Sequence, residues 1–186
     1  MAESATPFEY STVEDFFPTP VWVFDLATQR ASALNAKLCD CLESLLAPLP
    51  DIEVGAIWQT EQNLHEEAQF AELVSYIQQG ADTALRSLHV AHSPVVITGC
   101  WANISPRGGG HKSHVHPNNY LSGVYYVKVP PGAASISFHD PRAQANTVVP
   151  RPLAHNVYNS ITHTLPLEEG RLVIFPAWLA LPFTHI

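Results

Sequence analysis

The chain has 186 residues, a formal net charge of −8 and only 14% charged residues. This length is expected to form one domain, residues 1–186, with a hydrophobic core of its own. An acidic surface repels phosphate backbones, so we expect no nucleic acid partner. The sequence contains no apolar run of about 20 residues and no signal peptide at its start, which predicts a cytosolic protein without a membrane partner.

The front half of the chain is predicted to be mainly helical. After a flexible segment, residues 1–17, the aromatic and β-branched residues of Thr19–Leu26 indicate a strand. A helix is expected to start with Ser32 as its N-cap and to stop before Pro48. Apolar residues recur every three or four positions from Glu66 to Leu88, which predicts a second helix.

The back half, residues 94–186, is predicted to be a β-rich core. Strand patterns separated by Gly, Pro, Asn or Ser clusters occur at Val95–Ile104, Leu121–Val129, Ala134–Phe138, Val157–Leu165 and Arg171–Phe175. Consecutive strands without crossover helices favour an antiparallel sandwich or barrel, with the two helices covering one sheet. Trp58, Trp101 and Trp178 are expected to pack in the core. The predicted fold class is therefore α+β.

Three histidines, His111, His114 and His116, follow a run of three glycines and precede a predicted strand. In an extended backbone, His114 and His116 point to the same side, about 6–7 Å apart, which one metal ion can bridge. His111 is interpreted as a solvated loop histidine. The pair predicts a metal site whose third ligand comes from elsewhere in the chain.

Several segments together resemble a family of small 2-oxoglutarate- and Fe(II)-dependent oxygenases. The similarity begins near Pro18 and includes Trp58–Thr60 and Asn63–His65. It continues through Trp101–Asn103, His114–Asn118, Leu121–Pro130, Phe138–Arg142 and Gly170–Leu179. The resemblance implies a double-stranded β-helix, or jelly roll, with the N-terminal helices packed on one sheet.

The resemblance also implies Fe(II) and 2-oxoglutarate as cofactors and a hydroxylation reaction. His114 matches the first iron ligand, and His116 stands where the family has a carboxylate. Leu181 stands where the family has its distal histidine, so His185 is the expected third ligand. The residues expected to contact 2-oxoglutarate are Arg142, Asn103 and whichever of Tyr125 and Tyr126 points inward.

Other interpretations remain open. The family's basic residue would lie beyond Ile186, which suggests a truncated, non-catalytic jelly-roll relative, and a lost last strand predicts a homodimer through an open sheet edge. A cupin-like metal- or small-ligand-binding protein would use His111, His114 and His116 with His163 or His185. The substrate of an active enzyme would be a small molecule or a protein side chain.

Overall fold

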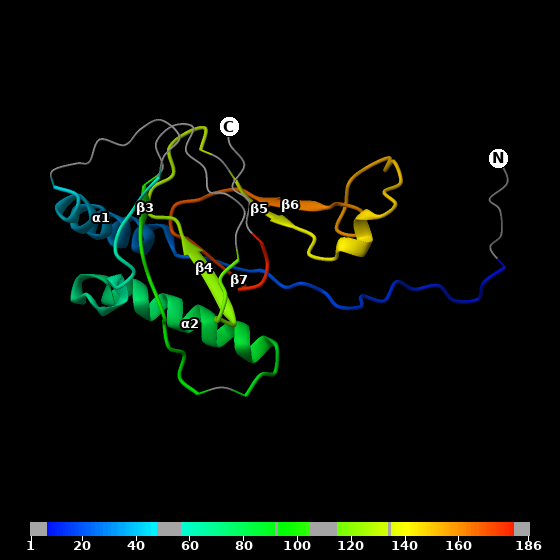
Figure 1. Cartoon of the computed structure of the whole chain (residues 1–186), viewed down its shortest axis with the longest axis horizontal. Helices are drawn as coiled ribbons and strands as arrows, with labels where there is room; N and C mark the ends of the chain where they lie inside the picture. The colour runs from blue at the N-terminus through cyan, green and yellow to red at the C-terminus, as the bar shows by residue number, and fades with distance from the viewer. Residues whose placement is uncertain (1–6, 48–56, 92, 105–114, 134, 181–186) are drawn as a thin grey trace.

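The computed structural model describes residues 7–47, 57–91, 93–104, 115–133 and 135–180, and Figure 1 shows how its elements are arranged. The helices and strands in chain order are β1 (Trp22–Asp25), α1 (Thr28–Leu45), β2 (Trp58–Gln59), α2 (Ala71–Ser87), β3 (Asn103–Ile104), β4 (Leu121–Tyr125), β5 (Ile136–His139), β6 (Thr162–Leu165) and β7 (Arg171–Pro176). Short 3₁₀ turns occur at Leu64–Glu66, Ala68–Phe70 and Ala143–Asn146. The predicted α+β class is confirmed.

The central sheet is antiparallel and has the strand order β1-β7-β4. Strand β7 lies in the middle and is buried from Leu172 to Pro176. Its side chains alternate between the two faces, as in any strand. Leu172 and Ile174 pack on the side of α2, whereas Val173 and Phe175 belong to a separate cluster with the other sheet. Strand β7 therefore joins two hydrophobic cores.

Strands β5 and β6 pair with each other and pack on the face of the central sheet opposite the helices. Phe138 of β5 meets Phe175 of β7 edge to face, with ring centroids 5.4 Å apart. The chain is thus built of a helical layer, the central sheet and the β5–β6 hairpin (Figure 1). The prediction that both helices cover one sheet agrees with this arrangement.

Helix α1 begins at Thr28, four residues before the N-cap predicted at Ser32. No side chain caps this end, and the first turn is instead fixed by packing. Gly170 has a φ of +84° and lies so close to Ala31 that a side chain at residue 170 would collide with it. A glycine in the turn before β7 therefore lets the start of α1 approach the sheet.

Several other predicted boundaries were wrong. Strand β4 ends at Tyr125 and not at Val129, and β6 begins at Thr162 and not at Val157. The second helix was expected from Glu66, but two 3₁₀ turns precede α2, which begins at Ala71. The expected strand Val95–Ile104 is reduced to β3, which pairs only with β2. Strand β2 was not predicted.

Trp178 does not pack in the core as expected, because its side chain is 54% exposed. It follows β7 directly, and the neighbouring Ala177 and Leu179 are buried in its place. Trp58 and Trp101 are half-buried.

Among the residues that the structure describes, no helix is both long and apolar enough to cross a membrane.

Candidate functional site

Tyr125 and Tyr126, at the end of β4, point to opposite faces of the central sheet. Tyr125 packs in the helical layer, and Tyr126 packs against the cluster that contains Val173 and Phe175. The alternation predicted from the sequence is therefore confirmed. The register with β7 shows that Tyr126 is the tyrosine that points away from the helices.

The Tyr126 hydroxyl is buried and has no hydrogen-bond partner among the described residues. Burial raises its pKa well above the usual range, although the Arg171 charge opposes this slightly. The hydroxyl is therefore a protonated donor at neutral pH. A buried polar group without a partner costs free energy, so a ligand that accepted a hydrogen bond from this hydroxyl would remove that cost.

Tyr125, in contrast, has a structural partner. Its hydroxyl donates a hydrogen bond of 2.7 Å to the side-chain carbonyl of Asn35 on α1, and Asn35 is itself buried. Burial, with the negative potential of Tyr76 and Glu72, raises the pKa of Tyr125 to about 12. This bond joins α1 to the sheet. It also engages the hydroxyl of Tyr125, which is the polar group that this side chain could otherwise offer to a cosubstrate.

Substitution of Tyr125 by phenylalanine is expected to lower the free energy of unfolding by about 1–2 kcal/mol, because it leaves the buried Asn35 carbonyl unpaired. Chemical denaturation at pH 7 measures this loss. The raised pKa means that the folded chain holds the phenolic proton more tightly, so wild-type stability should fall as the pH rises from about 10 toward 12. Tyr125→Phe should lose less stability in that range; equal losses would contradict the assignment.

His116 lies beside the end of β7. Its backbone N–H donates to the carbonyl of Ala177, and Ala177 donates in turn to Tyr120. The imidazole is half-buried and tilted against Trp101, with ring centroids 6.0 Å apart. The histidine segment and the segment that follows β7 are thus fixed side by side, as a site with ligands from both would require.

A cavity of about 810 Å³ extends from His116 along β4. Its floor is the apolar face of α2, and its walls are β4 and the segment 93–101. The described residues that line it include no Asp, Glu, Lys or Arg. The cavity therefore suits an apolar or extended uncharged occupant.

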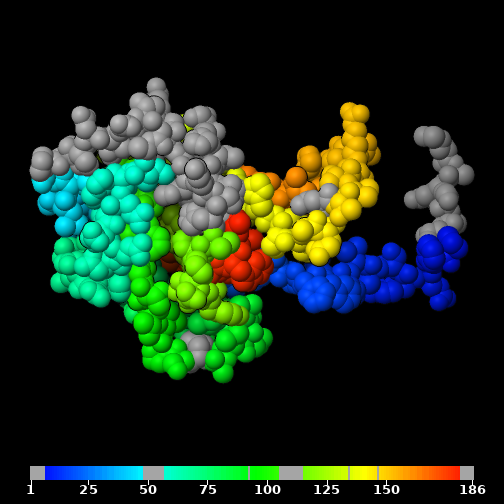
Figure 2. All heavy atoms as spheres, in the orientation of Figure 1, coloured from blue at the N-terminus to red at the C-terminus, as the bar shows by residue number. Residues whose placement is uncertain are grey.

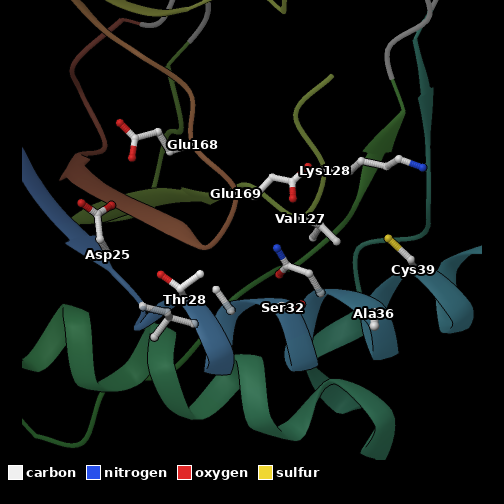
Figure 3. Close-up of a pocket in the computed structure, with 12 residues that line it drawn as sticks. Asp25, Thr28, Ser32, Ala36, Cys39, Val127, Lys128, Glu168 and Glu169 are labelled. Carbon is white, nitrogen blue, oxygen red and sulfur yellow. The ribbon is translucent and has the colours of Figure 1, made fainter. Parts of the chain in front are cut away.

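A second cavity, of about 600 Å³, lies between α1 and the turns beside the central sheet (Figure 3). It contains three carboxylates, but each already has a partner. Asp25 and Glu168 bind Arg171, and Glu169 accepts the backbone N–H of Val129. The hydrogen bond from Arg171 lowers the pKa of Asp25. The described residues that line this cavity include no histidine.

The other predicted cosubstrate contacts lie at the surface. Arg142 is exposed and donates two side-chain hydrogen bonds, of 3.0 and 2.8 Å, to Asp140. This pairing lowers the pKa of the Asp140 carboxyl group. Asn103 is exposed on β3 opposite Gln59.

His114 and His185, predicted as iron ligands, and His111 lie outside the described residues. In the described part of the chain, no cluster of three or more His, Cys, Asp or Glu side chains could hold a metal ion.

Sequence reasoning missed Asn35 and the cavity along β4. Asn35 left a signal, because it is a polar residue beside Leu34 and Leu38 on the buried face of the predicted helix. Such a residue needs a hydrogen-bond partner from another element. The sequence pattern does not predict the cavity, because the cavity depends on the distance between the segment 93–101 and β4.

Residues 99–181 match a protein family described as "Putative 2OG-Fe(II) oxygenase". A crystal structure of a prolyl-4-hydroxylase from Pseudomonas putida is similar over 90% of this chain and 86% of that chain, with a TM-score of 0.58 and 11% sequence identity. At this identity the likeness shows a shared fold. No curated protein matches the sequence. The matched segment includes β4, β5, β6, β7 and His116, so the likeness to this oxygenase family lies in the β-rich back half of the chain.

Proposed function

We propose that this protein is a 2-oxoglutarate- and Fe(II)-dependent hydroxylase. The observation that carries the proposal is the buried, unpartnered hydroxyl of Tyr126, which points into the space between the central sheet and the β5–β6 hairpin. A protonated phenol in an apolar environment is a strong donor to a carboxylate. The Tyr126 side chain therefore fits one end of 2-oxoglutarate.

The proposed iron ligands are His114, His116 and His185. Imidazole nitrogen suits iron, and three protein ligands leave coordination positions open. Bound Fe(II) and 2-oxoglutarate would supply the oxygen activation that converts a C–H bond into an alcohol. The contact of His116 with Ala177 supports the choice, since it joins the first ligand segment to the chain that leads toward His185.

Arg142 and Asn103 are proposed as further contacts to 2-oxoglutarate. Arg142 has a planar guanidinium that can hold a carboxylate with two hydrogen bonds. It already holds Asp140 in this way, so binding the cosubstrate requires the guanidinium to be shared or released. Tyr125 is left out of the proposed site because its hydroxyl belongs to Asn35.

We propose that the two sheets belong to a double-stranded β-helix. The edge-to-face contact of Phe138 and Phe175 and the antiparallel pairing within each sheet support this arrangement. A substrate would be a small molecule or a protein side chain. The similar solved structure is a prolyl-4-hydroxylase, so a prolyl residue in a peptide is the first substrate to test.

An anaerobic titration of the purified protein with Fe(II) and then 2-oxoglutarate tests the proposal. Chelation of iron by the cosubstrate should give a weak, saturable visible charge-transfer band. The band should be lost in His114→Ala and in His116→Ala. It should remain in His111→Ala, the matched control, since that histidine is interpreted as a loop residue.

Absence of the band in a folded protein would overturn the proposal and would favour a non-catalytic relative. A metal-dependent activity that needs no 2-oxoglutarate would instead favour the cupin-like interpretation. Circular dichroism of each variant shows whether the protein is folded.

A further inference from the structure

We infer that the cavity along β4 is a docking groove for the N-terminal arm, residues 7–17, of a second copy of this chain. The first argument is the open edge of β4. In the described sheet, β7 pairs with one side of β4 and nothing pairs with the other. The groove lies along that free side.

The hydrogen bonds of β4 show which backbone groups face the groove. Tyr126 exchanges two bonds with the turn and strand opposite, and the Tyr120 carbonyl accepts from Ala177. In an antiparallel strand, every second residue forms its backbone hydrogen bonds with the same neighbouring strand. The backbone N–H and C=O groups of the residues in between point to the other side. The N–H and C=O groups of Leu121, Gly123 and Tyr125 therefore face the groove, where an added strand can pair with them.

The rest of the groove suits an apolar strand. Ile77 and Ala81 of α2 form part of the floor, and Val95 and Ile97 form part of the opposite wall. The five residues of β4 extend for about 17 Å at roughly 3.4 Å each. A strand of similar length would cover the apolar surface beside Leu121–Tyr125 and leave the end of the groove at His116 open.

The N-terminal arm exposes apolar side chains that match the apolar lining of the groove. Residues 7–21 form neither helix nor strand, and the arm extends away from the body of the molecule (Figures 1 and 2). Tyr10, Val13, Phe16 and Phe17 are each at least 72% exposed. So much exposed apolar surface on an extended segment marks an interaction site. The arm's three acidic residues, Glu9, Glu14 and Asp15, are exposed, and they would have to stay at the open side of the groove in contact with water, because the described lining offers no Lys or Arg to pair with them.

Exchange between two copies follows from where the arm leaves the body. The arm leads into β1, which lies at the edge of the central sheet opposite β4. An arm that reached its own groove would have to pass β7 and β4. A two-fold dimer can instead bring each arm to the partner's groove, and both interfaces would then be the same.

Light scattering coupled to size-exclusion chromatography of the full chain tests this inference. We expect a concentration-dependent dimer that is lost when residues 2–17 are deleted. The double variant Tyr10→Ser/Phe16→Ser should weaken dimerisation at least tenfold. Val148→Ser/Val149→Ser is the matched control, because it removes two exposed apolar side chains from another loop and should leave the dimer intact.

A direct binding measurement completes the test. A fluorescent peptide with the sequence of residues 7–18 should bind the arm-deleted protein saturably, and Ile97→Asp in the groove wall should weaken this binding at least tenfold. A monomeric full chain, or a dimer that survives deletion of the arm, would overturn the inference. Loss of the dimer in the loop control would show that the other apolar loop is the interface.

Discussion

Truncation of Phe175 to alanine is expected to lower the free energy of unfolding by about 3–5 kcal/mol. Phe175 is fully buried near the C-terminal end of β7 and packs against Phe138 of the second sheet. The truncation removes apolar contacts from the core between the two sheets and leaves a cavity that their backbones cannot close. Urea denaturation followed by tryptophan fluorescence measures the loss.

Trp178→Ala is the matched control for Phe175→Ala. It removes a larger aromatic side chain three residues further along, but one that is 54% exposed. We expect a loss of less than about 1 kcal/mol. If Phe175→Ala does not fold, Phe175→Leu should still show a loss greater than that of Trp178→Ala. Similar losses for the two sites would contradict the assignment of the core to β7.

The sequence predicted the two helices best, because the apolar repeat of a helix lies within one continuous segment of the chain. Helices α1 and α2 follow an apolar repeat of three to four residues. This repeat predicted the central turns of both helices correctly. Their starts were wrong because packing, not capping, fixes them. The position of Gly170 against Ala31 decides where α1 begins, and these residues are far apart in the sequence.

The strands were less predictable because a strand forms only where a partner exists. Val95–Ile104 has the composition of a strand, but residues 95–99 line the groove and only Asn103 and Ile104 form a strand, opposite β2. Strand β7, which has partners on both sides, was predicted to within one residue.

The same reasoning limits what the sequence reveals about the site. Period-two alternation predicted that Tyr125 and Tyr126 separate, but only the register with β7 and the place of the helices identify Tyr126 as the residue facing the second sheet. The roles of His114, His116 and His185 as iron ligands stay predictions.

Substitution of Tyr126 by phenylalanine is expected to have two opposite effects. In the metal-free protein it removes a buried hydroxyl without a partner, so the free energy of unfolding should rise by about 1–2 kcal/mol. In the Fe(II)-loaded protein it removes the proposed donor to 2-oxoglutarate. The dissociation constant for the cosubstrate should then rise at least about tenfold, which corresponds to about 1.4 kcal/mol.

Tyr125→Phe is the control that separates these effects from a general loss of packing. It makes the same chemical change on the neighbouring residue, but its hydroxyl has the partner Asn35. We therefore expect lower stability and an unchanged affinity for 2-oxoglutarate, measured by chemical denaturation and by the charge-transfer band. A Tyr126→Phe protein that is less stable than wild type, with unchanged affinity, would mean that the hydroxyl serves the fold. Higher stability with weaker cosubstrate binding would mean that this position is kept polar for its ligand at the expense of the core.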